Sequence, residues 1–202
     1  MIINQIAQGK SKGKYTLFDR VKNDSGTEFG TVGGFFIDAN NTEYAIVCLD
    51  AQYRNPSANF LSTKVLVDGL PSYTDLSVYG ATETATFNCD KILAQATTSE
   101  TTSTGVSHCR SKSFIVDGTT YYGQLPNIAE LLYIYTHRTT LNTLDPTTTQ
   151  YSNNILASDR NVLSSTQRDS DNCWSLYYTG TTSANAKTSN WLIVPILEIP
   201  NE

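Results

Sequence analysis

The most constraining feature of this chain is one clearly delimited helix set among short β-prone runs. Asn127 can cap its N-terminus, and Glu130, three residues later, can complete a capping box. Apolar residues then recur at helical spacing as far as Tyr135. Arg138 follows near the C-terminal end, where positive charge is favourable. We therefore predict a helix over 127–138 whose apolar face packs on a core.

Shorter elements are predicted before this helix. Two β-prone runs, 33–37 and 42–49, flank a turn of Asp and Asn residues and form a predicted hairpin. The segment 50–77 alternates short apolar stretches with proline and glycine, which predicts an irregular loop with minor strands. A second helix is predicted over 87–96, where apolar residues share one face. The Thr/Ser tract over 97–104 predicts a loop.

Three strands are predicted after the long helix, at 161–166, 173–179 and 190–199. The segments between them, including 180–189, are interpreted as turns. Pro195 lacks an amide donor, so we expect the last strand to lie at a sheet edge or to carry a bulge there. Two short helices followed by a series of antiparallel strands predict an α+β fold.

The composition suits a β-rich protein whose surface is covered by hydroxyl and amide groups. The chain has 28 Thr, 19 Ser and 16 Asn among 202 residues, whereas charged residues make up only 16%. A net charge of −5 argues against a nucleic-acid partner, because such binding depends on a basic face. No apolar run reaches the roughly 18 residues of a membrane span, and no secretory signal follows the first residue. We therefore expect neither membrane insertion nor a signal peptide.

Positive charge is concentrated at the start of the chain. Residues 1–22 carry a net charge of +4, whereas the remainder carries −9. The basic residues are Lys10, Lys12, Lys14, Arg20 and Lys22. Two interpretations stay open: a solvated terminus without order, or a docking arm that orders on an acidic partner surface. We divide the chain into a basic N-terminal docking arm, 1–29, and a globular domain, 30–202.

The cysteines predict neither a metal site nor a disulfide framework. Cys48, Cys89, Cys109 and Cys173 are widely spaced and include no Cys-x-x-Cys pair. Free thiols are favoured, although a disulfide between Cys89 and Cys109 stays open. His108 and Cys109 form the only adjacent pair of soft ligands, which is too few for zinc. We predict no metal and no cofactor.

Sequence motifs for catalysis are also lacking. Ser164, Ser165 and Thr166 supply hydroxyls, but no Gly-x-Ser-x-Gly elbow surrounds them and both histidines lie upstream. No phosphate-binding or dinucleotide-binding glycine pattern occurs. We expect these hydroxyls to make hydrogen bonds within a strand, and we assign no catalytic residue. The chain is not expected to be an enzyme.

Several short motifs occur in the order found in one known family. They lie at 122–132, which contains Leu-Pro-Asn-Ile-Ala-Glu-Leu; at 162–166, which contains Ser-Ser-Thr; at 173–176, which contains a tryptophan; and at 194–196. In this order the chain resembles the C-type-lectin-like family, over about residues 30–200. The resemblance implies an α+β fold in which two short helices accompany antiparallel sheets.

The chemistry known in this fold does not carry over to these residues. The segments 125–127 and 190–192 supply too few carboxylates for the calcium-dependent sugar site of related lectins. Cys173 has no second cysteine near it, so the late cysteine pair of the formylglycine-generating enzymes is lacking. Gly123 and Gln124 replace the family's usual aromatic before Leu-Pro, a change that other apolar contacts can absorb. Binding or assembly remains as the implied role.

Proteins of this fold often serve tailed bacteriophages as display and host-contact modules. The resemblance therefore implies a non-enzymatic structural protein of a phage particle, such as a head fibre or a capsid decoration for host attachment. Its expected partners are other virion proteins, contacted through the arm, and further copies of the chain in a homo-oligomer. A host surface glycan or protein is the expected ligand.

The predicted ligand surface combines tyrosine and asparagine side chains in the C-terminal half. It comprises Tyr151, Asn153, Asn154, Tyr177 and Tyr178. Mixtures of Tyr, Ser and Asn suit adaptable binding. The alternative function is a bacterial cell-surface or exported ligand-binding module, to which the lack of a signal sequence is an objection.

Overall fold

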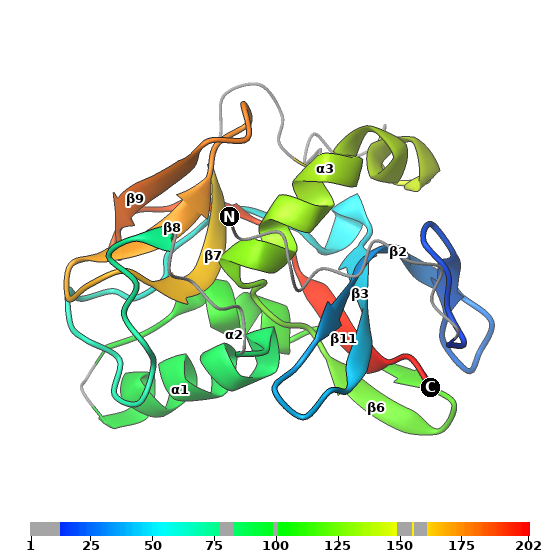
Figure 1. Cartoon of the computed structure of the whole chain (residues 1–202), viewed down its shortest axis with the longest axis horizontal. Coiled ribbons are helices and arrows are strands. Elements are labelled where there is room, and N and C mark those ends of the chain that lie inside the picture. The colour runs from blue at the N-terminus through cyan, green and yellow to red at the C-terminus, as the bar shows by residue number, and fades with distance from the viewer. Residues whose placement is uncertain (1–12, 77–82, 99–100, 149–154, 156–160) are drawn as a thin grey trace.

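Two main sheets meet along the longest helix in the computed structural model, which describes residues 13–76, 83–98, 101–148, 155 and 161–202 (Figure 1). The fold is α+β, as the order of elements predicts. None of the helices in these residues is long and apolar enough to cross a bilayer.

The first sheet brings the two ends of the described chain together. Its strand order is β1-β2-β3-β11, and each neighbouring pair is antiparallel. Its strands are β1 (Arg20–Lys22), β2 (Glu28–Ile37), β3 (Glu43–Leu49) and β11 (Ile196–Pro200). The predicted hairpin is confirmed, because β2 and β3 pair along almost their whole length.

The second sheet has the order β4-β10-β7-β8-β9. Its β10 and β7 are parallel, and its other neighbours are antiparallel. Its strands are β4 (Asn55–Ala58), β7 (Val162–Gln167), β8 (Asn172–Leu176), β9 (Thr182–Ala186) and β10 (Trp191–Ile193). A separate hairpin consists of β5 (Ser113–Val116) and β6 (Thr119–Tyr122), and its buried side chains join the core of the first sheet.

The helices divide between the two sheets. They are α1 (Ala85–Thr98), α2 (Thr104–Arg110) and α3 (Ile128–Leu144), with a 3-10 turn η2 (Ala51–Tyr53). The pair α1 and α2 contacts the second sheet at β7 and β4. The longer α3 contacts β2 and β3 of one sheet and β7 and β8 of the other (Figure 1). Its buried side chains therefore belong to a core shared by both sheets.

The predicted start of α3 is confirmed by its hydrogen bonds. Asn127 Oδ1 accepts from the Glu130 amide at 2.9 Å, and Glu130 Oε2 accepts from the Asn127 amide at 2.7 Å. The helix continues beyond the predicted end, because Leu141 is buried in the shared core. It ends at Asp145, which forms the C-cap.

Pro195 marks a change of sheet rather than a bulge in one strand. The predicted strand 190–199 is two strands, β10 in the second sheet and β11 in the first. Pro195 lies between them, and its carbonyl accepts from the Leu49 amide at 3.0 Å. Proline interrupts the amide ladder, so the chain leaves one sheet here and enters the other.

Several elements were not predicted. The segment 180–189, interpreted as turns, contains β9, and α2 begins at the end of the predicted loop 97–104. The β5–β6 hairpin was also missed. The β9 segment is a stretch of small polar residues without hydrophobic periodicity, so its strand conformation depends on pairing with β8.

The motifs that carry the family resemblance contact one another in the fold. The Ser165 amide donates to the Pro126 carbonyl at 2.8 Å, and the Ile128 amide donates to Thr166 Oγ1 at 2.9 Å. Ser164 Oγ donates to the Trp174 carbonyl at 2.6 Å. The prediction that the strand hydroxyls make structural hydrogen bonds is confirmed for Ser164 and Thr166, and Ser165 Oγ accepts from an asparagine amide at 3.1 Å.

All four cysteines are buried free thiols, which decides the open question about Cys89 and Cys109. Burial raises the pKa of Cys48 to about 11 and that of Cys89 to about 12, so neither is a ready thiolate. The rings of His108 and His137 each bond a backbone carbonyl, at 2.7 and 3.1 Å. The described residues contain no group of three or more His, Cys, Asp or Glu side chains placed to hold a metal ion.

A buried pair of carboxyl groups connects α3, α1 and β11. Glu198 on β11 accepts from the Ala85 and Thr86 amides in the first turn of α1, at 2.8 and 2.9 Å. Glu130 on α3 is 2% exposed, and its Oε1 meets no donor among the described residues. Burial and the neighbouring Glu198 carboxylate both disfavour the charged form of Glu130. A proton kept on Glu130 therefore avoids a second buried negative charge there.

We expect this pair to lower the free energy of unfolding as the pH rises. Burial, then the charge of Glu198 and its hydrogen bond, raise the pKa of Glu130 well above its ordinary value. The native state keeps a proton that the unfolded chain loses near its ordinary pKa of about 4.3. The stabilisation is therefore complete below that pH and is lost as the pH rises through the raised native pKa.

Urea unfolding of wild type and Glu130→Gln across about pH 5–9 checks this prediction. Glutamine keeps a donor towards Glu198 without a titrating proton, so the variant should show a flatter dependence of unfolding free energy on pH. Glu202→Gln, at the exposed last residue, removes the same charge and should keep the wild-type slope. A wild-type slope in Glu130→Gln would contradict the retention of a proton on Glu130 in the native state.

Candidate ligand-binding surface

The turn between β8 and β9 lies directly on α3. Gly180 donates its amide to the Tyr177 carbonyl at 2.8 Å and has a φ of +89°, so the turn is tight. A Cβ atom at Gly180 would lie 2.6 Å from the Tyr135 ring of α3. Any larger residue would push the turn away from the helix. Glycine therefore allows the close approach of these two elements.

This contact brings aromatic side chains of both elements onto one surface. The rings of Tyr177 and Tyr178 lie 4.3 Å apart at a tilt of 56°. Tyr135 and Tyr178 both pack against the shared core while remaining partly exposed. The guanidinium of Arg138 lies 3.9 Å from the centre of the Tyr135 ring. We call these four residues the aromatic surface.

Arg138 gives the aromatic surface a positive charge. Its Nη1 donates to the Tyr135 carbonyl at 3.0 Å, which fixes the guanidinium over the ring. No carboxylate among the described residues forms an ion pair with it. A stacked guanidinium without an acidic partner has donors available for an anionic or polar ligand.

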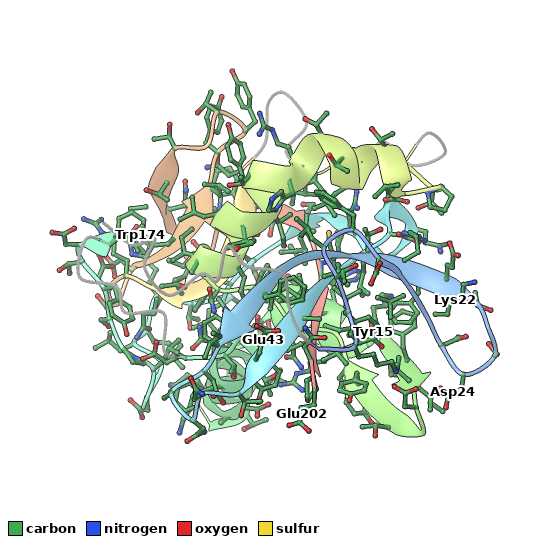
Figure 2. All side chains as sticks on the ribbon, turned by 45° about the vertical axis from the view of Figure 1, so that its right-hand side comes forward. Tyr15, Lys22, Asp24, Glu43, Trp174 and Glu202 are labelled. Atoms are coloured by element: carbon green, nitrogen blue, oxygen red, sulfur yellow. The ribbon has the colours of Figure 1, made fainter. Side chains whose placement is uncertain are left out.

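Trp174 extends the aromatic character along β8. Its Nε1 donates to the Tyr73 carbonyl at 2.6 Å, and its ring packs on the shared core. The guanidinium of Arg168 lies 5.5 Å from the ring and 3.8 Å from the Asp169 carboxylate. Figure 2 shows Trp174 at the opposite end of the molecule from Lys22. Trp174 and Lys22 therefore belong to separate surfaces.

The predicted ligand surface is described only in part. Tyr177 and Tyr178 lie on the aromatic surface, whereas Tyr151, Asn153 and Asn154 lie outside the described residues. Sequence reasoning missed the contribution of α3. The sequence pattern that could have indicated this contribution is Tyr135 and Arg138, three positions apart on the predicted helix. That spacing puts both on one face.

The described part of the predicted arm belongs to the folded domain. Tyr15 is 8% exposed and Val21 is 1% exposed, both within the core of the first sheet. The Tyr15 amide donates to Asn201 Oδ1 at 2.7 Å, near the end of the chain. Figure 2 shows Tyr15 on the same part of the molecule as Glu202. The boundary predicted after residue 29 therefore does not separate an arm from the domain; we call residues 13–22 the N-terminal strap.

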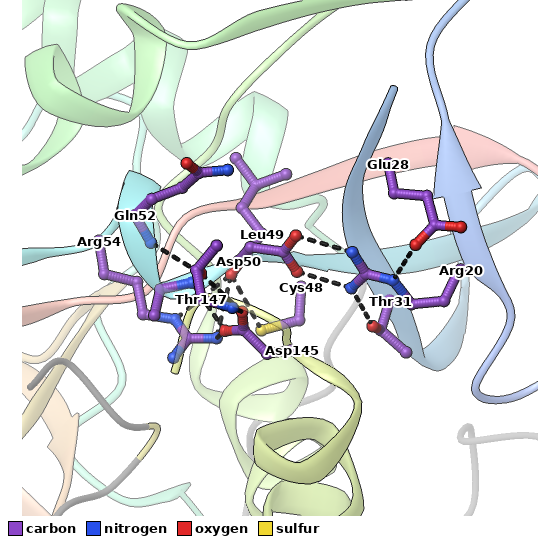
Figure 3. A network of polar contacts seen from close by, with 11 residues as sticks. Arg20, Glu28, Thr31, Cys48, Leu49, Asp50, Gln52, Arg54, Asp145 and Thr147 are labelled. Atoms are coloured by element: carbon purple, nitrogen blue, oxygen red, sulfur yellow. Dashed lines mark hydrogen bonds and ion pairs between the residues drawn. The ribbon is translucent and has the colours of Figure 1, made fainter. Parts of the chain in front are cut away.

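The basic residues of the strap are paired within the chain. Arg20 forms a two-pronged contact with Asp50, at 2.7 and 2.8 Å (Figure 3). Lys14 pairs with Asp117, and Lys22 lies 3.6 Å from Glu28. These three side chains, predicted as partner-docking groups, are engaged by the domain's own carboxylates. Lys10 and Lys12 lie outside the described residues.

Comparisons with known proteins give one informative likeness. No family model matches the chain, and no curated protein matches it in sequence. Among solved structures, it is similar to a fimbrial protein from Bacteroides ovatus, with a TM-score of 0.58 and 12% identity. The match covers 92% of this chain and 49% of that protein, so the chain spans about half of its length. The likeness is one of fold.

Proposed function

We propose that this chain is a non-enzymatic attachment domain that binds a surface glycan through the aromatic surface. The observation that carries this proposal is the Arg138 guanidinium, held over Tyr135 and without an acidic partner among the described residues, on the helix that contacts the turn with Tyr177 and Tyr178. Tyrosine rings offer apolar faces and polar hydroxyls, a combination that suits sugar rings. The arginine adds charged donors for a carboxylate-bearing sugar. Hydroxyls of the Ser-Ser-Thr strand and both histidines are engaged in structural hydrogen bonds, which supports a binding role over catalysis.

A C-type-lectin-like fold is part of this proposal. Three features support it: the pairing of β3, in the β2–β3 hairpin, with β11; the capped helix after Leu-Pro; and the contact between the Leu-Pro and Ser-Ser-Thr segments. These features match the order of motifs that carries the resemblance. The calcium site of sugar-binding lectins has no place in it, so recognition rests on aromatic and arginine side chains.

Two settings are proposed for the attachment domain. The first is a phage particle, where a head fibre or capsid decoration would display it to the host. The second is a bacterial cell surface, where it would form part of a larger surface assembly; the fimbrial neighbour favours this second candidate. Purifying native phage particles and the cell-envelope fraction, then probing both for the protein, distinguishes them. Fixed stoichiometry with particles supports the first, and enrichment in the envelope alone supports the second.

We expect Arg138→Gln and Tyr178→Ala each to weaken glycan binding by at least about tenfold, because arginine and tyrosine dominate recognition energy. The probe is a panel of immobilised bacterial surface polysaccharides, neutral and carboxylate-bearing. Lys64→Gln and Tyr122→Ala change exposed residues of the same classes elsewhere and should bind as wild type. Equal binding by all four variants would contradict the assignment of the surface.

A further inference from the structure

The outer edge of β9 presents unpaired backbone groups to solvent. In the β8–β9 ladder, the Tyr177 amide donates to Thr181 and the Lys187 amide donates to Asp171. Antiparallel pairing alternates along a strand, so the intervening odd-numbered residues of β9 also bond β8. The amides and carbonyls of Thr182 and Ala184 therefore point away from the sheet. No hydrogen bond to these four groups occurs among the described residues.

The other three edges of the two main sheets carry protection against pairing with another chain. The strand β1 is only three residues long, carries Arg20 and Lys22, and has a bulge. On β4, Pro56 lacks an amide donor. On β11, the first residue is bridged by Gln124 and the last is a proline. Charges, prolines, bulges and short strands are the usual means by which proteins blunt sheet edges.

The β9 edge has none of these features. Its sequence is Thr-Ser-Ala-Asn-Ala, without charge, proline or bulge, and all five residues pair with β8 in continuous register. Ala184 at its centre is exposed. The strand thus offers a flat, regular edge with small side chains, to which a further strand can be added without steric hindrance.

We propose that β9 pairs with β9 of a second copy of this chain, antiparallel and across a two-fold axis at Ala184. In this register Thr182 lies opposite Ala186 of the second copy, and the outward groups of Ala184 bond their own equivalents. The strand is self-complementary, as a two-fold interface requires. The second sheets of the two copies then form one continuous sheet.

The uncharged β9 edge allows a second copy to be the occupant. The chain carries a net charge of −5, so two copies repel each other over most of their acidic surfaces. The run from Thr181 to Ala186 contains no charged residue, which lets two copies approach there without like charges facing one another. In this antiparallel register the turns that carry Tyr177 and Tyr178 lie at opposite ends of the paired strands, so the dimer presents two separate aromatic surfaces. A multivalent target would then be bound by both.

Sedimentation analysis over a concentration series tests this proposal. Wild type should have twice the chain mass of 22.2 kDa at high concentration and dissociate on dilution. Ala184→Lys places like charges at the two-fold axis and should give the monomer mass throughout. Ala184→Pro removes one outward amide without touching the bonds to β8 and should do the same. Thr179→Lys adds the same charge in the exposed turn and should remain dimeric.

Amide hydrogen exchange identifies the strand that pairs. In the wild-type dimer the amides of Thr182 and Ala184 should be protected, and in Ala184→Lys the Thr182 amide should exchange rapidly. The amide of Ser183, which bonds β8, should stay protected in both and so reports that the variant is folded. A monomeric wild type, a dimer that survives Ala184→Lys, or loss of the dimer in Thr179→Lys would each overturn the proposal.

Discussion

Replacing Asp145 by alanine is expected to lower the free energy of unfolding by about 3–5 kcal/mol, because it removes the carboxylate that forms a buried ion pair with Arg54. The side chains of Arg54 and Asp145 are 1% and 2% exposed, and Arg54 Nη2 lies 2.9 Å from Asp145 Oδ2. The same carboxylate accepts from the Ala51 amide at 2.7 Å and from Thr147 (Figure 3). It therefore holds the end of α3 against the segment after β3.

Chemical denaturation of Asp145→Ala and Asp117→Ala measures this effect against a matched control. Asp117 also pairs with a basic residue, Lys14, but both side chains are exposed, so its loss should cost under about 1 kcal/mol. Asp145→Asn keeps the shape and part of the hydrogen bonding and should fall between the two. Equal midpoints for the two alanine variants would show that the buried pair is not a major source of stability.

Lowering the pH should weaken the interactions of Asp145 with Arg54, Ala51 and Thr147. Burial alone would raise the pKa of Asp145, but the Thr147 hydrogen bonds, the charge of Arg54 and the Ala51 amide together lower it. A lowered native pKa means that this stabilisation is present above the unfolded pKa and is lost as the pH falls through the native one. The stabilisation at Asp145 is therefore lost as the pH falls, whereas that at Glu130 is lost as the pH rises.

Deleting residues 1–22 is expected to destabilise the domain by about 3–5 kcal/mol, since the N-terminal strap is part of the first sheet. The deletion removes the buried Tyr15 and Val21 and uncovers the core beneath them. It also removes Arg20, the partner of Asp50, whose side chain is 2% exposed. A buried carboxylate would then lack its cation.

Deleting residues 1–12 instead should leave the unfolding midpoint close to that of the full chain, because the strap remains. This shorter deletion still removes Lys10 and Lys12, so it is the variant that tests the proposed docking role of the arm. Incorporation of the shorter form into its native assembly at the normal level would refute that role. A full-length midpoint for the 1–22 deletion would show that the strap contributes little to stability.

Local signals account for the parts of the fold that were predicted correctly. The capping box of Asn127 and Glu130 spans three residues, and the β2–β3 hairpin closes over one short turn. Both depend on neighbours in the sequence, so residue type and spacing suffice to predict them. The hydroxyl-rich strand β7 was also predicted, together with the structural role of its hydroxyls.

The strap was misassigned because residues 8–14, which overlap its start, contain three lysines, two glycines and no apolar residue, a composition typical of a solvated tail. No sequence pattern near Arg20 predicts its contact with Asp50, which is 30 residues away. Likewise, no pattern predicts the contact of Tyr15 with Asn201, which is 186 residues away. Contacts of this kind form only when distant segments are brought together. The composition of the segment therefore led to its assignment as an arm.

By itself the sequence determined the α+β class, the capped helix and the first hairpin, because these depend on local spacing and residue type. Only the tertiary structure decided that the turn with Tyr177 and Tyr178 contacts the helix that carries Tyr135 and Arg138, that the strap joins the first sheet, and that β9 is an edge. Each of these depends on which distant segments become neighbours. Packing of α3 between two sheets, rather than any local pattern, sets those neighbours.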